Sequence, residues 1–261
     1  MAGTTWNTAL VTGASGGIGE EYARQLAAQG ADLVLVARSG DALVRLAGEL
    51  HHRHGVSCEA VPVDLTTDAG IAEACKRAEA VDLLVNNAGY GISAHLLDTD
   101  PADVDGMIRL NVLALARMTR AALPGMIARG HGGIVNVSSV AGFQPSPSFA
   151  TYNATKAFVT MFTEALSLEV KGTGVRVQAL CPGLTRTGFQ AVAGETGTDG
   201  LPGFVWQEPR AVVEASLSGL RRSSVVVVSG VPNKVLIGAT SMLPHGIKRR
   251  LAGAVMARRG R

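Results

Sequence analysis

The chain has 261 residues, of which 47% are hydrophobic, 17% charged and 4% aromatic, with a formal net charge of +3. A chain of this length and apolar content can bury roughly three quarters of its unfolded surface in one core, which excludes a disordered protein and a disulfide-stabilised miniprotein. Thirty-two glycines suit helices that pack closely on a sheet, so we expect a single α/β domain.

Seven short apolar runs alternate with longer segments of helical periodicity. Each run is apolar at nearly every position, which is typical of a strand covered on both faces. The expected strands are 8–11, 31–37, 56–63, 81–85, 133–137, 175–180 and 225–228, and the expected helices are 17–29, 40–53, 68–79, 101–129, 150–171 and 208–220. This strict alternation predicts a doubly wound, three-layer Rossmann-type α/β fold with a seven-stranded parallel sheet, formed by residues 1–230.

The connection at 183–208 is rich in Gly and Thr and is long for a compact domain. It follows the sixth strand, so we expect a lid over the crevice where doubly wound sheets bind their ligands. Its composition favours an apolar substrate, although a lid also needs apolar residues simply to close on the core. The apolar side chains are Leu184, Phe189, Leu201, Phe204, Val205 and Trp206.

The first expected strand runs into a glycine-rich turn, TGASGGIG at 12–19, and then into a helix. Such a turn lets backbone N–H groups approach a pyrophosphate at the positive end of a helix. The spacing G-x-x-x-G-x-G is one residue longer in its first interval than the general dinucleotide fingerprint. A loose turn of this kind can also serve packing alone.

Tyr152 and Lys156 are four residues apart on an expected helix and therefore share one face. Lowering a tyrosine pKa from about 10 to about 7 takes roughly 4 kcal/mol. An ammonium 4 Å away supplies about 1 kcal/mol in water and about 4 kcal/mol at an effective dielectric constant of 20. The pair can do acid–base chemistry only where water is partly excluded, and the alternative is a tyrosine and a lysine on a solvated helix face.

Further motifs follow in order: NNAG at 86–89, Asn111 in NVLA, IVNVSS at 134–139, Y-x-x-x-K at 152–156, and Pro182-Gly183 followed by Thr187. Together with the glycine-rich turn they resemble the classical short-chain dehydrogenase/reductase family over residues 8 to about 190. The resemblance implies hydride transfer between a nicotinamide cofactor and a ketone or secondary alcohol. Enoyl reductases of the family space the tyrosine and lysine by seven residues, and its sugar epimerases use another glycine spacing, so neither fits.

The resemblance implies a role for each catalytic residue. Tyr152 would be the general acid/base, and Lys156 would bind the nicotinamide ribose and lower the pKa of Tyr152. Ser139 would hydrogen-bond the substrate carbonyl, since it precedes Tyr152 by the family's usual thirteen residues, whereas Ser138 misses by one. Adjacent strand residues face opposite ways, so only one serine can point into the site. Asn111 would hold a proton-relay water, with a solvated polar residue in a helix as the alternative.

The resemblance also assigns cofactor contacts beyond Tyr152 and Lys156. Asp64 looks like the family's adenine contact, though an Asp after a strand is also a common helix cap. Asn87, Ala88 and Gly89 would lie along the adenosine ribose, and part of their role is structural. The remaining contacts are Gly13, Ser15, Gly17, Ile18, Gly19, Leu65, Pro182, Gly183 and Thr187.

The end of the second strand predicts the choice of cofactor. A carboxylate there would bind the 2′-hydroxyl of NAD(H), and an arginine would bind the 2′-phosphate of NADP(H). The sequence has Ala37 followed by Arg38 and Ser39, with no acid, and a guanidinium suits phosphate bidentately. We therefore expect NADP(H), although Gly16 stands where the family's second basic determinant would be.

Charge is distributed unevenly along the chain. Residues 1–220 hold 15 Lys/Arg and 21 Asp/Glu, whereas residues 221–261 hold nine Lys/Arg and no acid. Residues 231–261 are expected to be a basic amphipathic extension that could contact an anionic membrane peripherally. The alternatives are a helix docked on the acidic body and a solvated end. Its basic residues Lys248, Arg249, Arg250, Arg258 and Arg259 interleave with Leu251, Val255 and Met256, and without interleaved aromatics we expect no nucleic-acid binding.

Cys58, Cys75 and Cys181 are odd in number and form no C-x-x-C pair, so we expect no disulfide framework, no metal site and a reducing cytoplasm. The sequence predicts neither an export signal nor a membrane span. The expected partner is a small lipophilic carbonyl or alcohol, fatty-acyl or steroid-like, and the resemblance implies a homodimer or homotetramer. The alternative function is a catalytically silent NADP(H)-binding regulatory or scaffold protein.

Overall fold

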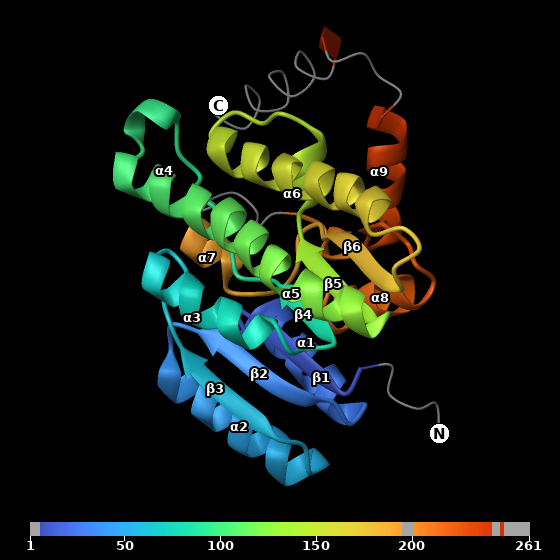
Figure 1. Ribbon diagram of the computed structural model, residues 1–261. Coiled ribbons are helices and arrows are strands. Elements are labelled where there is room, and N and C mark those ends of the chain that lie inside the picture. The colour runs from blue at the N-terminus through green and yellow to red at the C-terminus, as the bar shows by residue number, and fades with distance from the viewer. Residues whose placement is uncertain (1–5, 195–200, 242–245, 248–261) are drawn as a thin grey trace.

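The computed structural model describes residues 6–194, 201–241 and 246–247. In this part of the chain seven parallel strands form one sheet of order β3-β2-β1-β4-β5-β6-β7 (Figure 1). The order reverses between β1 and β4, so the predicted doubly wound fold is confirmed. The strands are β1 (Thr8–Thr12), β2 (Asp32–Ala37), β3 (Cys58–Pro62), β4 (Leu83–Asn86), β5 (Gly132–Val137), β6 (Val175–Cys181) and β7 (Val226–Val228).

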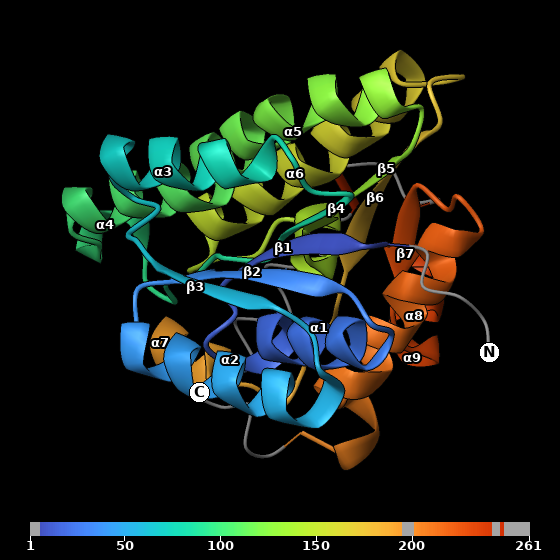
Figure 2. The ribbon, with the colours of Figure 1, turned by 60° about the horizontal axis from the view of Figure 1, so that its bottom comes forward.

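Helices cover both faces of this sheet (Figure 2). On one face lie α1 (Gly17–Ala28), α2 (Gly40–His54) and α8 (Pro209–Arg221), and on the other lie α3 (Asp68–Ala78), α4 (Pro101–Ile108), α5 (Leu115–Arg129) and α6 (Ala150–Glu169). Two short helices complete the described part, α7 (Phe189–Ala193) and α9 (Val231–Ser241).

The core has two layers because successive strand residues point to opposite faces. In β1, Ala9 and Val11 pack with α1, α2 and α8, whereas Leu10 packs with α3, α5 and α6. All three side chains are fully buried. This explains why each strand is apolar throughout and why its position could be predicted from the sequence.

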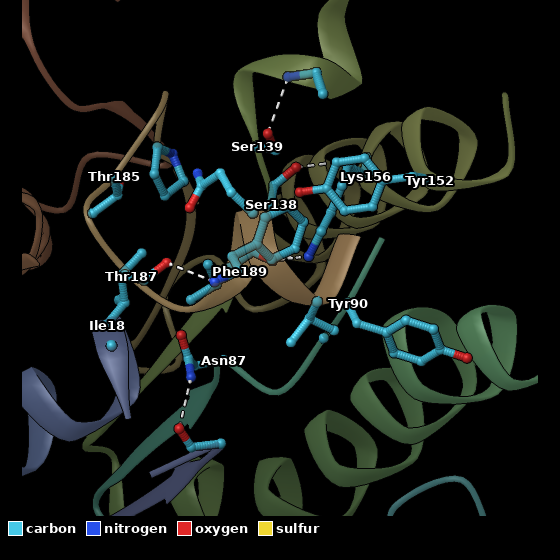
Figure 3. A pocket seen from close by; sticks show the side chains of 18 of the residues that line it. Ile18, Asn87, Tyr90, Ser138, Ser139, Tyr152, Lys156, Thr185, Thr187 and Phe189 are labelled. Carbon is cyan, nitrogen blue, oxygen red and sulfur yellow. Dashed lines mark hydrogen bonds between the residues drawn. The ribbon is translucent and has the colours of Figure 1, made fainter. Parts of the chain in front are cut away.

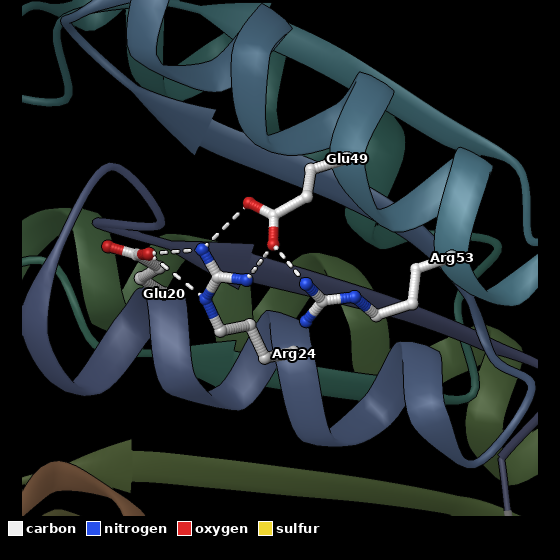
Figure 4. A network of polar contacts seen from close by, with 4 residues as sticks. All are labelled: Glu20, Arg24, Glu49 and Arg53. Atoms are coloured by element: carbon white, nitrogen blue, oxygen red, sulfur yellow. Dashed lines mark hydrogen bonds and ion pairs between the residues drawn. The ribbon is translucent and has the colours of Figure 1, made fainter.

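Ion pairs of Arg24 link α1 to α2 (Figure 4). Arg24 contacts Glu20 at 2.8 Å and Glu49 of α2 at 2.6 Å, and Arg53 approaches Glu49 at 3.3 Å. These ion pairs are partly exposed, so they contribute little to the stability of the fold. They set the position of α2 against α1 rather than the stability of the fold.

The segment expected to be one helix over 101–129 is interrupted. Between α4 and α5 the backbone forms a π-helical stretch, η2 (Arg109–Ala114), that contains Asn111. The Asn111 amide bonds to the backbone of Tyr90 and to Thr155 rather than to solvent. A π-bulge is a common way to aim such a side chain out of helical register.

The two ends of the lid region pair with each other. Thr185 and Gln207 form a parallel bridge, and the Gln207 N–H donates to the carbonyl oxygen of Leu184 at 2.9 Å. The described residues between them include α7 and a 3₁₀ turn, η4 (Gly203–Val205). Backbone hydrogen bonds between its two ends therefore fix the base of this long connection.

The chain after β7 begins with α9, which contacts the 3₁₀ turn η3 (Val140–Phe143). The basic residues expected to contact a membrane, Lys248 to Arg250 and Arg258 to Arg259, lie outside the described residues. Within the described ranges, every helix is too short or too polar to cross a bilayer.

Candidate active site

The glycine-rich turn brings β1 and α1 into close backbone contact. Gly13 and Gly17 have φ angles of +65° and +58°, a conformation that favours glycine. A Cβ on Gly19 would collide with the carbonyl oxygen of Gly13, and one on Gly13 would lie 2.7 Å from Nδ2 of Asn87. Glycine at these positions leaves the N-terminus of α1 open to a ligand, which is the arrangement that binds phosphate.

A hydrogen-bonded junction joins this turn to the segment after β4. Oγ1 of Thr12 accepts from the N–H groups of Asn87 and Ala88, both at 2.9 Å. Nδ2 of Asn87 donates to the carbonyl oxygen of Thr12, also at 2.9 Å. Thr12, which motif matching left without a role, therefore holds the NNAG segment against the turn at the point where the strand order reverses.

A cleft of about 610 Å³ opens above this junction at the carboxyl ends of the strands. Figure 3 shows Tyr152 and Lys156 on one side of it and Ile18, Asn87 and Thr187 on another. Thirteen of the predicted site residues line it: Gly13, Ser15, Gly17, Ile18, Asn87, Ala88, Gly89, Ser139, Tyr152, Lys156, Pro182, Gly183 and Thr187. The predicted residues that do not line it are Gly19, Arg38, Ser39, Asp64, Leu65 and Asn111.

Tyr152 and Lys156 reach the cleft from the first turns of α6. Nζ of Lys156 lies 5.7 Å from the centre of the Tyr152 ring and donates to the carbonyl oxygen of Val137 at 2.8 Å. The exposed fractions are only 8% for Tyr152 and 5% for Lys156. Burial lowers the pKa of Lys156 to about 8. The pair thus lies in the dehydrated surroundings that its chemistry requires.

The two adjacent serines after β5 differ in their partners. Oγ of Ser138 bonds to the carbonyl oxygen of Lys156 at 2.7 Å and lies 2.8 Å from Oγ1 of Thr160, so this hydroxyl anchors α6. Oγ of Ser139 accepts from the N–H of Ala141 at 3.1 Å, a bond that does not use the hydroxyl hydrogen. Ser139 is therefore the serine positioned to donate to a ligand in the cleft.

Asn111 lies behind the cleft, with 1% of its surface exposed. Its Oδ1 accepts from the N–H of Tyr90 at 3.1 Å, and its Nδ2 donates to the carbonyl oxygen of Tyr90 at 2.9 Å and to Oγ1 of Thr155 at 3.1 Å. Thr155 donates in turn to the carbonyl oxygen of Tyr152 at 2.7 Å. The asparagine side chain therefore ties the end of the NNAG segment to the backbone of the helix that carries Tyr152.

Arg38 lies at the exposed end of β2, outside the cleft described so far. The Thr66 N–H has the largest effect in holding the pKa of Asp64 below its usual range, and the Thr66 hydroxyl and the Arg38 guanidinium add to it. Both bonds to Asp64 are 2.8 Å long, so this carboxylate caps a turn. Leu65 is buried beside it. The cationic group at this edge can receive an anion.

The lid and η3 give the cleft an apolar wall. The ring centres of Phe189 and Phe149 lie 5.5 Å and 6.0 Å from that of Tyr152. Of the expected lid residues, Leu184 and Phe189 line the cleft; Leu201, Phe204, Val205 and Trp206 do not, and Phe204 is 73% exposed. Among the described lining residues, Lys156 alone carries a charge.

Several lining residues were not predicted as site residues. Tyr90 directly follows the NNAG motif, and Phe149 lies one helical turn before Tyr152, so their sequence positions could have indicated them. Val140 follows Ser139 in the chain, and Val192 lies one helical turn after Phe189 on α7. Thr185, which pairs with Gln207 at the base of the lid, also lines the cleft.

The turn, the cleft and the Tyr152–Lys156 pair define a dinucleotide-binding oxidoreductase of the short-chain type. The family model described as short chain dehydrogenase matches residues 7–197. Very-long-chain 3-oxoacyl-CoA reductases from Anas platyrhynchos and Bos taurus are 34% and 39% identical over 216 and 181 residues, which cover 80% and 67% of this chain. These alignments span 67% and 58% of the relatives' own lengths.

A solved structure shows the same arrangement over nearly the whole chain. A short-chain dehydrogenase from Sphingobium yanoikuyae in complex with NADPH is 36% identical, with a TM-score of 0.80, and covers 97% of this chain and 95% of that one. The chain belongs to the short-chain dehydrogenase family, a family of oxidoreductases that act on ketones and alcohols.

Proposed function

We propose that this protein is an NADP(H)-dependent oxidoreductase that interconverts a lipophilic ketone and its secondary alcohol. The observation that carries this proposal is the buried Tyr152–Lys156 pair, which faces the same cleft as Ser139 and the glycine-rich turn. A nucleotide held at the N-terminus of α1 reaches the tyrosine across this cleft.

The proton chemistry belongs to the three side chains. Ser139 donates a hydrogen bond to the substrate oxygen, and Tyr152 gives that oxygen its proton in reduction and removes it in oxidation. The Lys156 ammonium lies 5.7 Å from the tyrosine ring and stabilises the phenolate. Where water is partly excluded this attraction is worth several times its value in solution. The bound cofactor supplies or accepts the hydride, and the protein orients the two reactants.

The cofactor preference rests on the end of β2. Arg38 is exposed there with Ser39 beside it, and β2 itself ends in Ala37 without an acid. A guanidinium pairs with a 2′-phosphate in a bidentate way, so we propose NADP(H) over NAD(H). The NADPH complex of the Sphingobium protein supports this choice. Gly13, Ser15, Gly17, Ile18, Asn87 to Gly89, Pro182, Gly183 and Thr187 would hold the rest of the nucleotide.

The substrate class rests on the wall of the cleft. Val140, Phe149, Leu184, Phe189 and Val192 make the wall apolar, and Lys156 is the lone charge among the described lining residues. A substrate anion close to the carbonyl would have to give up its hydration without an additional partner. We propose a ketone that is uncharged and apolar around its carbonyl, such as a fatty-acyl or steroid-like compound, in line with the names of the very-long-chain relatives.

The test is a fluorescence titration with NADPH and NADH, followed by nicotinamide absorbance against a panel of lipophilic ketones. Tyr152→Phe should keep NADPH affinity within about threefold and lower turnover about 10²- to 10⁴-fold, the usual contribution of a general acid. Tyr90→Phe is the matched control, because the Tyr90 hydroxyl donates to the carbonyl oxygen of Asp103, outside the cleft. Failure of the native protein to bind either nucleotide would overturn the proposal.

The alternative is a catalytically silent NADP(H)-binding protein. It predicts nucleotide binding with no turnover of any ketone in the panel, and no difference between the native protein and Tyr152→Phe. The geometry of Ser139, Tyr152 and Lys156 supports the enzyme over this alternative, since a silent protein has no use for a buried lysine whose pKa is lowered to about 8.

We further propose that the catalytic unit comprises the sheet and its helices through residue 230, and that it forms a homodimer or homotetramer. Support for assembly comes from the outer face of α6, where Phe158, Met161 and Leu168 are 40%, 67% and 75% exposed. Contiguous exposed apolar side chains on one helix are typical of an interface.

A further inference from the structure

Helix α9 presents an apolar face to solvent. Val231, Val235 and Ala239 recur at every fourth position, and Val231 and Val235 are 71% and 65% exposed. Leu236, 45% exposed, widens this face, and Lys234 is exposed at its edge. Apolar side chains in such a stripe, with a cation alongside, are the pattern of a helix that lies at an interface.

The opposite face of α9 is anchored to the protein. Nδ2 of Asn233 donates to the carbonyl oxygen of Ser229 at 2.9 Å, and a Cβ on Gly183 would collide with the Asn233 amide. Ile237 and Thr240, on the same side as Asn233, are partly buried. The side of α9 that carries Asn233 thus faces the protein, and the apolar stripe faces solvent.

This anchorage places α9 at the rim of the catalytic cleft. Gly183 lines the cleft, and so does Val140 of η3, the turn that α9 contacts. Figures 1 and 2 show α9 at the outer edge of the molecule beside α8, on the β6 and β7 side of the sheet. A surface that contacts the apolar stripe of α9 therefore lies about one helix diameter, roughly 10 Å, from the cleft wall.

The charge of residues 221–261 indicates which kind of partner the apolar stripe binds. Residues 221–261 contain nine Lys/Arg and no acid, whereas the preceding 220 residues have an excess of acids. Arg221, Arg222 and Lys234, the cations of this stretch that the structure describes, are all exposed. The apolar stripe belongs to a stretch in which every Lys, Arg, Asp and Glu position is a cation. It is therefore complementary to a surface that is both anionic and apolar, such as a bilayer with anionic headgroups.

We propose that the outward face of α9 is a docking surface for anionic lipid bilayers, through which the cleft receives a lipophilic substrate from the membrane. The docking itself stands on the exposure, anchorage and charge of α9; the delivery of substrate rests on the proposed function. Val231, Val235 and Leu236 enter the acyl boundary, and Lys234 on the same helix contacts the headgroups.

The experiment is co-sedimentation of the full-length protein with vesicles of phosphatidylcholine, with and without phosphatidylglycerol. The native protein should bind the vesicles that contain phosphatidylglycerol, less so as salt is added. Val235→Asp should weaken this binding at least about tenfold, because it removes an apolar contact and adds a charge that the lipid repels. Val44→Asp on α2 is the matched control, since Val44 is 63% exposed, and its binding should equal that of the native protein.

Folding and catalytic activity are measured separately, in buffer without vesicles. Circular dichroism and NADPH reduction of a water-soluble ketone should be unchanged in Val235→Asp. Docking is overturned if the native protein ignores anionic vesicles, or if Val235→Asp binds them as tightly as the native protein. A native dimer that Val235→Asp dissociates, without vesicle binding by either, would instead assign the face to a second copy. If the native protein binds anionic vesicles but reduces no ketone, the proposed function is wrong and the docking proposal is still supported.

Discussion

Burial of Lys156 in the site is energetically unfavourable for the folded protein. The residue is 5% exposed, and its ammonium has one backbone carbonyl, that of Val137, as its hydrogen-bond partner in the described structure. Burial lowers its pKa to about 8 from 10.5. The charged form is thus less favourable in the folded protein than in the unfolded one, as expected for a group kept for catalysis rather than stability.

In the cofactor-free protein, Lys156→Met should raise the free energy of unfolding at pH 7 by about 1–3 kcal/mol, because it removes a buried charge. Between pH 8 and 10.5 the unfolded state binds more protons than the folded state at this lysine, so the native protein gains stability as pH rises. The advantage of Lys156→Met should shrink by about 1 kcal/mol by pH 9. Urea unfolding at pH 7, 8 and 9 measures both effects.

The control for this experiment is Lys171→Met, which alters an exposed lysine and should follow the native protein at every pH. The range stops at pH 9 because burial raises the pKa of Cys181 to about 11, which has the opposite sign and lowers stability above the ordinary thiol pKa. Parallel pH profiles for native protein and Lys156→Met would show that the lysine is not dehydrated.

Arg38 is the residue that decides between the two nicotinamide cofactors in our proposal. Ala37→Asp with Arg38→Leu should shift the ratio of NADPH to NADH affinity toward NADH by about 10- to 100-fold or more, since hydrogen bonds to charged groups are worth about 1.5–3 kcal/mol. Fluorescence titration gives the ratio. Arg45→Leu, an exposed arginine on α2, should leave it unchanged. An unaltered ratio in the double variant would refute the assignment at the end of β2.

At the scale of elements, α6 is the part on which the site depends. A buried polar layer attaches it to the sheet: Nδ2 of Asn136 donates to Oγ1 of Thr163 at 3.0 Å, and Nδ2 of Asn86 donates to Oδ1 of Asn136 at 2.9 Å. Ser138 adds its bond to the backbone of Lys156. Such bonds are directional, so they specify one position of the helix along β5 where apolar packing alone would allow several.

The interruption between α4 and α5 shows the limit of periodicity. Apolar spacing over 101–129 is helical throughout, and the prediction of a single helix followed from it. The π-helical stretch arises because the Asn111 amide satisfies both backbone groups of Tyr90, which belongs to a loop 21 residues away in sequence. That partnership exists only once the segment after β4 and the segment between α4 and α5 have been brought together.

For the whole molecule, our proposal of an oligomer rests on the outer face of α6. Phe158 stacks on Phe162 at 5.6 Å, and Met161 and Leu168 extend the apolar surface along the helix. Met161→Glu should reduce the mass measured by sedimentation velocity to half or less of the native value, because a charge at the centre of an interface loses its hydration without a partner. Val44→Glu is the control. A native protein that is already monomeric would contradict the assembly.

Much of this molecule followed from its sequence because the determinants are local. Strands buried on both faces read as continuous apolar runs, glycines mark the turn that backbone atoms crowd, and a four-residue spacing on a helix puts Tyr152 and Lys156 on one face. The doubly wound class followed from the alternation of such segments, whereas the order of the strands in the sheet came from the structure alone.

What only the tertiary structure decided are contacts between residues far apart in the chain. It bonded the Ser138 hydroxyl to the backbone of α6, placed Asn111 behind the site, directed Phe204 to solvent and Phe189 onto Tyr152, and packed Asn233 of α9 against Gly183. Composition could not distinguish these cases, because a serine, a phenylalanine or an amphipathic helix has the same local signature whichever neighbour it meets. The choice depends on which surfaces packing brings within a few ångströms, and that is a property of the folded chain.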